Sequence, residues 1–414
     1  MVKVLDLFQT TFFLNQASNG ANLIWATEQA LLGYLNAYLQ GGKDPNGGQF
    51  AGVLPMLKDQ LLGQDWEVVW GPSLCTAVPY LAGYAQNSMF VARSRASKVY
   101  VVAIAGTNAV SPLNWVVQDF AVDPSYMAAW PIKSFAAPAW HIPYTDRPAI
   151  SQATLNGLGS LLSLQDPASG QLLADFLKAS AAPDQRVIFS GHSLGGALSP
   201  TLALHLYPDP SKSGWAEVLT LPSAGASPGN SAFARLFAAA YPAKPADGGR
   251  WWNMDLMNQR DEIPYMWNLT AQVVAKQNAL GNYPSVYGVL AYALGLALRN
   301  QMGDIGRFVA TGRYMNLTQS AFSTDWGYWA WVQDPDNPGQ WAYPPTWVSL
   351  PLPTDADPMW SSFGFLAAFG VAHQDQYFYA VAGMALPRMR LAYESLSMSM
   401  QPVVRPGPEP MEAG

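Results

Sequence analysis

The chain has 414 residues, of which 50% are hydrophobic and 13% are aromatic, so it carries enough apolar material for a large core. Only 12% of the residues are charged, the net charge is −6 and no basic cluster occurs, which argues against a nucleic-acid partner. A charge content this low suits a protein that works near lipid or a hydrophobic substrate. It suits equally a protein with a large core and loops rich in proline and glycine.

Cysteine and histidine are too sparse to build a metal site. The single cysteine, Cys75, excludes a disulfide framework and a cysteine-based metal site. The four histidines lack the spacing of metal ligands, so we expect neither a metal nor an organic cofactor. His141 lies in a proline-containing loop and His205 at helical spacing, so we expect both to be structural; the other two histidines are His192 and His373.

Signals for targeting or membrane insertion are missing from the sequence pattern. Residues 1–16 lack the basic region, apolar stretch and cleavage site of a signal peptide, which leaves the cytoplasm or secretion by another route open. No stretch reaches 18 strongly apolar residues, so we expect no transmembrane segment. Residues 285–298 come nearest and predict a buried or interfacial helix.

Taken in order, the chain predicts alternating helices and strands after a helical N-terminal segment at 1–65. In that segment the clearest helical periodicity is at residues 21–39, which end at Gly41-Gly42. The later elements follow their hydrophobic patterns. They are strands at 66–70, 88–92 and 99–105, helices at 149–164 and 172–179, a strand at 187–189, a helix at 194–204, a strand at 218–221 and a helix at 232–240.

The stretch RVIFSGHSLGGALSPTLAL, residues 186–204, combines a buried strand, a sharp turn and an apolar helix. A serine at such a turn, here Ser193 in a G-x-S-x-G sequence, predicts a nucleophile elbow. Gly191 and Gly195 flank it where a Cβ would collide with the strand or the helix. The backbone N–H of Leu194 lies at a helix N-terminus and can face developing negative charge. For an isolated G-x-S-x-G sequence, an ordinary turn is the alternative interpretation.

A second segment carries a family resemblance. The strand at 99–105 ends in Gly106-Thr107, and Asn114-Trp115 and Asp119 follow shortly after it. Together with the serine motif, this pattern resembles the fungal-type (class 3) lipase family of the α/β-hydrolases. The resemblance spans roughly 85–265 and 365–385. It implies an α/β fold, the α/β-hydrolase fold, with a mostly parallel central sheet flanked by helices.

The resemblance also implies how negative charge is stabilised at the site. Thr107 would supply one oxyanion N–H and Leu194 the other, while Asp119 would support the Thr107 loop. His192, Gly191 and Gly195 would support the elbow around the serine. The family usually has F-R-G-T where this chain has Ile-Ala-Gly-Thr at 104–107, so the arginine of that motif is missing here.

Two segments are candidates for covering the site. In the family, residues 108–130 would correspond to an amphipathic lid; a plain surface helix is the alternative. Residues 265–360 are longer than the family pattern, and we interpret them either as an aromatic-rich cap that shapes an acyl pocket or as a structural insertion. The whole is expected to be a single α/β-hydrolase domain at 1–400 with a flexible tail at 401–414.

The acid and the base are predicted from the C-terminal half. Asp261, in the run Asp-Glu-Ile-Pro, matches the family's D-x-V/I-P acid, and Asp255 is the runner-up because it lies within the predicted strand. His373 matches the family's C-terminal histidine, with Tyr377 following at a spacing one residue longer than usual. The order Ser193, Asp261, His373 is that of the α/β-hydrolases.

These residues imply chemistry on an ester. His373 would take the serine proton while Asp261 orients the imidazole, giving an acyl-enzyme that water hydrolyses without a cofactor. We therefore expect a carboxylic-ester hydrolase, first of all a triacylglycerol lipase, whose partner is an ester or lipid substrate at a lipid–water interface. The alternatives are a phospholipase, feruloyl esterase or polyester hydrolase, and a catalytically silent binding module on the same fold.

Overall fold

The structure is a computed structural model. The residues it describes are 5–22, 24–58, 65–76, 81–106, 127–135, 147–259, 261, 263–265, 268, 314–322, 327–330, 346–349, 373, 377 and 380–381. Its helices are α1 (Leu7–Ala17), α2 (Glu28–Gln40), α3 (Val53–Met56), α4 (Gln152–Ser163), α5 (Leu173–Ser180), α6 (Leu194–Leu206) and α7 (Ser231–Ala240). Single 3-10 turns are η3 (Pro210–Lys212), η4 (Asp247–Gly249) and η5 (Ile263–Tyr265).

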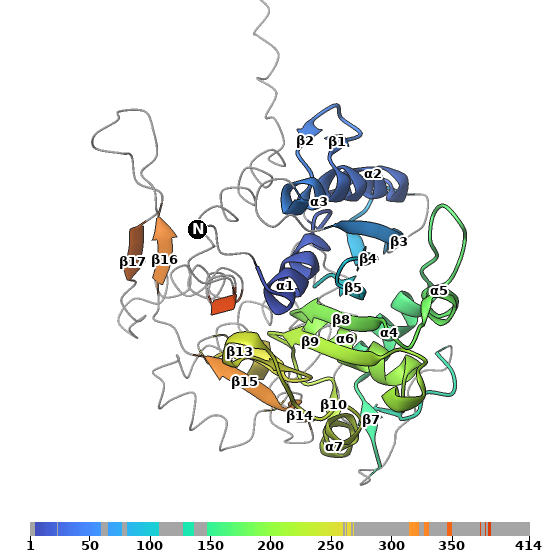
Figure 1. Ribbon diagram of the computed structural model, residues 1–414, viewed down its shortest axis with the longest axis vertical. Coiled ribbons are helices and arrows are strands. Elements are labelled where there is room, and N and C mark those ends of the chain that lie inside the picture. Colours follow the sequence, from blue (N-terminus) through green and yellow to red (C-terminus); the bar gives the residue numbers. More distant parts are fainter. Residues whose placement is uncertain are drawn as a thin grey trace, which may run out of the picture.

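A central sheet organises these elements (Figure 1). Its strands are β3 (Trp66–Thr76), β4 (Ala85–Ser94), β5 (Val99–Ile104), β8 (Arg186–His192), β9 (Glu217–Ser223), β13 (Asp255–Asn258) and β15 (Gln319–Phe322). Within the described ranges the sheet order is β15-β13-β9-β8-β5-β4-β3. Strands β3, β4 and β5 pair antiparallel, whereas β5, β8, β9, β13 and β15 run parallel. The predicted mostly parallel sheet with flanking helices is confirmed.

The short strands of the described residues form separate small sheets. They are β1 (Gly42–Lys43), β2 (Gln49–Phe50), β6 (Ala128–Ala129), β7 (Ala149–Ile150), β10 (Gly229–Asn230), β11 (Lys244–Pro245), β12 (Trp251–Trp252), β14 (Tyr314–Met315), β16 (Gly327–Ala330) and β17 (Thr346–Ser349). Two strands from the predicted insertion are built into the fold, because β15 pairs with β13 and β14 pairs with β10. Most of 265–360, the lid candidate up to residue 126 and the tail at 401–414 lie outside the described residues.

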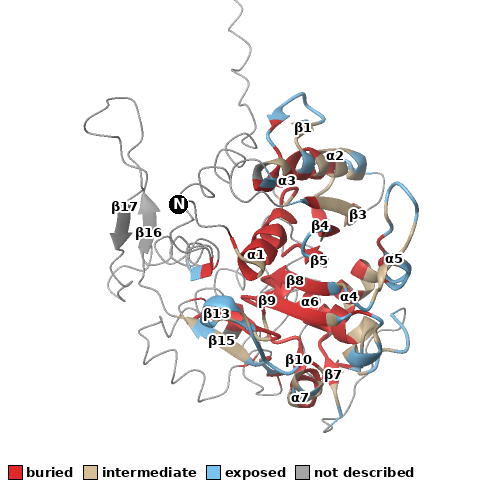
Figure 2. Cartoon of the chain, in the orientation of Figure 1, coloured by how far each residue is buried: buried red, intermediate tan, exposed pale blue. Residues whose placement is uncertain are grey.

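Both faces of the central sheet are buried, as the unbroken apolar run of β5 requires. Side chains alternate between the faces of a strand. Val99, Val101 and Ala103 belong to the core beneath α1 and α2. Tyr100, Val102 and Ile104 belong to the core beneath α4 and α6. The burial colours of Figure 2 show the same pattern, with β8, α1 and α6 almost wholly buried.

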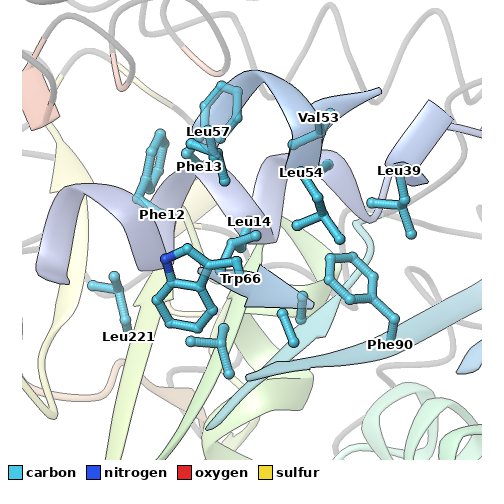
Figure 3. Close-up of a cluster of buried hydrophobic side chains, with 14 of the residues drawn as sticks. Phe12, Phe13, Leu14, Leu39, Val53, Leu54, Leu57, Trp66, Phe90 and Leu221 are labelled. Atoms are coloured by element: carbon cyan, nitrogen blue, oxygen red, sulfur yellow. The ribbon is translucent and has the colours of Figure 1, made fainter. Parts of the chain in front are cut away.

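Helix α1 lies against β5 and β8 and begins with a capping box between Asp6 and Gln9. Every residue of α1 except Leu7 is buried, so the helix has no exposed face. Its aromatic residues join the cluster of Figure 3, with Phe12 and Phe13 among the labelled side chains.

The start of α1 is tied to segments from the far end of the chain. Asp6 forms an ion pair with Arg250, and Gln9 donates from Nε2 to the carbonyl of Val381 at 2.9 Å. Arg250 also donates to that carbonyl, at 3.2 Å.

The structure contains predicted elements whose ends differ from the predicted ones. The helix expected at 21–39 begins only at Glu28, where the Thr27 hydroxyl caps the N–H of Ala30, and it ends at Gly41, whose φ of 82° suits glycine. The strand expected at 66–70 continues to Thr76. Across the described part of the chain, no helix is both long and apolar enough to cross a membrane.

Candidate active site

The turn between β8 and α6 holds Ser193 in a conformation that side-chain residues rarely adopt. Its φ is 60° and its ψ is −123°. A Cβ on Gly191 would lie 1.9 Å from the Gly195 carbonyl oxygen, and a Cβ on Gly195 would lie 2.6 Å from that of Ile104. The turn is thus closed so tightly that only glycine fits at either position. Ser193 N–H donates to the Ser223 carbonyl at 2.9 Å, which fixes the turn to β9.

The N-terminus of α6 meets the end of β5 beside this serine. Leu194 is the first residue of α6, so its N–H has no acceptor within the helix. A Cβ on Gly106 would lie 3.2 Å from the Ser193 Cβ, so the residue before Thr107 is packed against the elbow. Thr107 itself and Asp119 lie outside the described residues.

Asp261 and His373 are brought into direct contact although 112 positions separate them. Asp261 Oδ2 lies 2.8 Å from His373 Nδ1. The same oxygen accepts from the Tyr377 hydroxyl at 2.8 Å, and Oδ1 accepts from the Ile263 N–H at 3.0 Å. The Asp261 side chain is fully buried. A buried carboxylate with three donors is well satisfied, and one of those donors is the imidazole that it orients.

Tyr377 links this acid to β13. Its hydroxyl donates to Asp261 and accepts from the Asn258 N–H at 2.9 Å. Burial holds the pKa of Tyr377 well above its usual range, so the hydroxyl keeps the proton that it donates. The sequence pointed to Tyr377 only as a neighbour of His373. Its contact with Asp261 has no signal in spacing alone.

His192 joins the serine segment to the histidine segment. Its Nε2 lies 2.7 Å from the His373 carbonyl oxygen, and its Nδ1 lies 3.0 Å from the Ser223 hydroxyl. A carbonyl only accepts, so Nε2 carries the proton and Nδ1 can accept from Ser223. Burial, with the nearby His373, lowers the pKa of His192 well below its usual value, so the ring is neutral. The rings of His192 and His373 lie 4.8 Å apart between centroids.

The runner-up acid, Asp255, has different partners. It is buried in β13, and its Oδ1 accepts from the Gly225 N–H at 3.1 Å. Burial, with the neighbouring Asp261 adding to it, raises the pKa of Asp255 to about 8. Asp261 is therefore the acid that the structure brings to His373.

The remaining candidates have structural surroundings. His205 packs edge-on against Trp130 and Phe135, and burial lowers its pKa. Burial raises the pKa of Cys75 to about 11. His141 lies outside the described residues, and within the described part of the chain no three His, Cys, Asp or Glu side chains cluster as metal ligands would.

Comparison with known families defines the class. The family model for lipase (class 3) matches residues 101–270, which contain the end of β5, the elbow and Asp261. This region is similar to the class 3 lipase family, and the chain has an α/β-hydrolase fold that it shares with the solved M37 lipase. A comparison with curated protein sequences gives no match.

Solved lipases are similar to this chain to different degrees. The M37 lipase is 20% identical, with a TM-score of 0.57 over 95% of this chain and 98% of its own. The triacylglyceride lipase of Rhizomucor miehei is 18% identical over 49% of this chain and 60% of its own, with a TM-score of 0.33. The lipase of Rhizopus microsporus var. chinensis is 19% identical over 63% and 70%, with a TM-score of 0.33.

Proposed function

We propose that the protein is a carboxylic-ester hydrolase, and specifically a triacylglycerol lipase, in which Ser193, His373 and Asp261 form the catalytic triad. The observation that carries the proposal is the 2.8 Å contact between Asp261 and His373, because it supplies the acid–imidazole pair that a serine nucleophile needs. The hydrogen bond from His192 to the His373 carbonyl ties that pair to the residue before Ser193.

The chemistry follows from these contacts. Ser193 Oγ attacks the ester carbonyl carbon, its proton passes to His373 Nε2, and the carbonyl electron pair moves onto oxygen. Asp261 on Nδ1 keeps the imidazole in the tautomer that can accept this proton and stabilises the imidazolium. The N–H groups of Leu194 and Thr107 hold the oxyanion. Collapse expels the alcohol, which takes the proton from His373, and water then releases the acid by the same steps.

Two features of the chain support a lipid ester over a small soluble one. The class 3 lipase match covers the elbow and the acid, and only 12% of the residues are charged. A charge content this low suits contact with an aggregated lipid substrate. Phospholipid, feruloyl ester and polyester remain as other outcomes of the substrate test.

The test is fluorophosphonate labelling followed by an acyl-chain series. We expect the native chain to be labelled and Ser193→Ala not to be. Ester hydrolysis in Ser193→Ala should fall by about 10⁶-fold, the loss seen when a triad nucleophile is removed. Labelling that persists in Ser193→Ala would exclude this serine as the nucleophile, and a native chain without labelling or hydrolysis would support a silent binding module.

The substrate class is then measured on p-nitrophenyl esters of increasing length and on triglyceride emulsion against phospholipid vesicles. Preference for long chains and triglyceride is the expected result. A preference for phospholipid, or for short aryl esters alone, would overturn the triacylglycerol part of the proposal and keep the serine hydrolase part.

A further inference from the structure

The end of β5 is held from the outside by a turn of the N-terminal segment. Gly106 donates its N–H to Asn19 Oδ1 at 2.9 Å, and its carbonyl accepts from Asn22 Nδ2 at 3.4 Å. Asn22 Nδ2 also donates to Asn19 Oδ1 at 2.9 Å, which uses both hydrogens of one amide group. The side chains of Asn22 and Asn19 therefore hold both backbone polar groups of Gly106, although they come 84 and 87 residues earlier in the sequence.

The turn that carries these amides is itself anchored. The Asn19 side chain donates to the Gln16 carbonyl at the end of α1, at 3.3 Å. The Ser88 hydroxyl on β4 donates to the Ser18 carbonyl at 2.7 Å. The Asn19–Asn22 pair, meaning these two amide side chains, is thus fixed to α1 on one side and to the sheet on the other.

On its inner side Gly106 touches the elbow. A Cβ on it would lie 2.7 Å from the His192 carbonyl oxygen and 3.2 Å from the Ser193 Cβ. Gly106 is therefore clamped between the Asn19–Asn22 pair and the serine turn. In a trans peptide the carbonyl and the next residue's N–H point in opposite directions. Asn22 holds the Gly106 carbonyl, and Asn19 holds both the Gly106 N–H and the Asn22 amide. The pair, ordered by Asn19, therefore also directs the following N–H, which the sequence predicts as an oxyanion donor.

We propose that Asn19, assisted by Asn22, is a positioning residue for the oxyanion-stabilising end of β5. The related F-R-G-T motif has an arginine at the position of Ala105 in this chain. We assign the supporting role of that arginine to the Asn19–Asn22 pair. This inference rests on the proposed ester hydrolysis. It assigns to the N-terminal segment a share in transition-state stabilisation.

The test compares Asn19→Leu and Asn22→Leu with the native chain. Leucine has a similar volume but neither accepts nor donates. We expect Asn19→Leu to lower kcat by about 10- to 100-fold with little change in KM, because a misdirected oxyanion donor costs transition-state energy. Asn22→Leu should lower kcat less, since its bond to Gly106 is longer.

A trifluoromethyl ketone separates positioning from a general structural role. Ser193 adds to its carbonyl, forming the Oγ–C bond while the carbonyl electron pair moves to oxygen, so the adduct needs the same donors as the transition state. In Asn19→Leu its inhibition constant should rise by the same factor by which kcat falls. An unchanged inhibition constant, or a change in KM alone, would overturn the proposal.

Asn230→Ala is the matched control. Asn230 is also an amide side chain that holds backbone groups, at Ala149, Phe233 and Arg147, and it caps α7. The Asn230→Ala variant should have a lower melting temperature and an unchanged kcat. If native activity is present and depends on Ser193 but Asn19→Leu behaves like the control, the positioning role is wrong while the ester hydrolase proposal stands. A native chain without activity rejects the function itself.

Discussion

Asp261 and Asp255 are six positions apart, both buried, and have opposite surroundings. The Asp261 carboxylate accepts from an imidazole, a tyrosine hydroxyl and a backbone N–H. For Asp255 the structure gives a backbone N–H at 3.1 Å, and burial raises its pKa to about 8. Burial favours the neutral acid, and this is the direction in which the pKa of Asp255 moves. The comparison teaches that the donors around an acid, and not its depth, suit it to orient a histidine.

Of the changes that test this comparison, the largest effect should come from exchanging Asp261 for its amide, with the same exchange at Asp255 as the control. Asp261→Asn puts an amide against His373 Nδ1 and disfavours the tautomer that accepts the serine proton. We expect kcat to fall by about 10³- to 10⁴-fold. Asp255→Asn, its matched control, replaces a neutral acid by a neutral amide and should stay within about threefold of the native rate. Steady-state kinetics on a soluble ester checks both.

The opposite ranking would break the comparison. If Asp255→Asn were the slower variant, the acid would act from β13, and the contact between Asp261 and His373 would be structural.

A smaller effect on kcat is expected from removing the Tyr377 hydroxyl, which donates to Asp261. Tyr377→Phe removes the hydroxyl bond to Asp261 Oδ2 and leaves the Asn258 N–H without its acceptor. We expect about a tenfold lower kcat and about 1–3 kcal/mol lower unfolding free energy, since buried groups lose their partners. Kinetics and urea unfolding measure the two together.

Tyr241→Phe is the control for this change. Tyr241 is also buried, and its hydroxyl donates to the carbonyls of Ala203 and Tyr207. The Tyr241→Phe variant should have a lower unfolding free energy and the native kcat. Equal kcat in both variants would mean that the Tyr377 hydroxyl supports the fold and not the acid.

The change with the smallest expected effect on rate concerns stability against pH and is specific to Asp255. Its folded pKa of about 8 lies above the unfolded value of about 3.9, so the folded chain binds this proton more tightly. Its contribution to stability is fully present below about pH 4 and is lost as pH rises towards 8. Asp255→Asn cannot ionise, so its stability relative to the native chain should rise over that range, by on the order of 1 kcal/mol per pH unit. Urea unfolding at pH 5 and pH 8 tests this, and a pH-independent difference would contradict it.

The sequence predicted the architecture well because the sheet strands are continuous apolar runs and the elbow joins a strand period to a helix period. Helix α1 shows the limit. Its residues are buried on every side, so LFQTTFFLNQA has no amphipathic stripe to mark a helix. Its capping box, Asp6 with Gln9, was the local signal that could have located its start.

For the site, the serine motif and the motifs of the class 3 lipases that this chain resembles identified Ser193, Asp261 and His373 as candidates, and the structure brings the acid to the histidine. Contacts between segments were beyond reach. The bonds of Asn19 and Asn22 to Gly106 and of His192 to His373 cross 84 to 181 positions. Asparagine in a loop has many uses, and nothing in its spacing indicates a strand end so far along the chain.

The contacts of the start of α1 with Arg250 and Val381 affect how the chain folds while it is being synthesised. They join positions 244 and 372 residues apart, so α1 leaves the ribosome well before these partners and must wait for them before its packing is complete. At ordinary translation speeds that wait lasts on the order of a minute, during which an apolar helix has no finished surface to cover it. A nascent chain that stops before residue 381 would therefore lack the contacts that cover the start of α1.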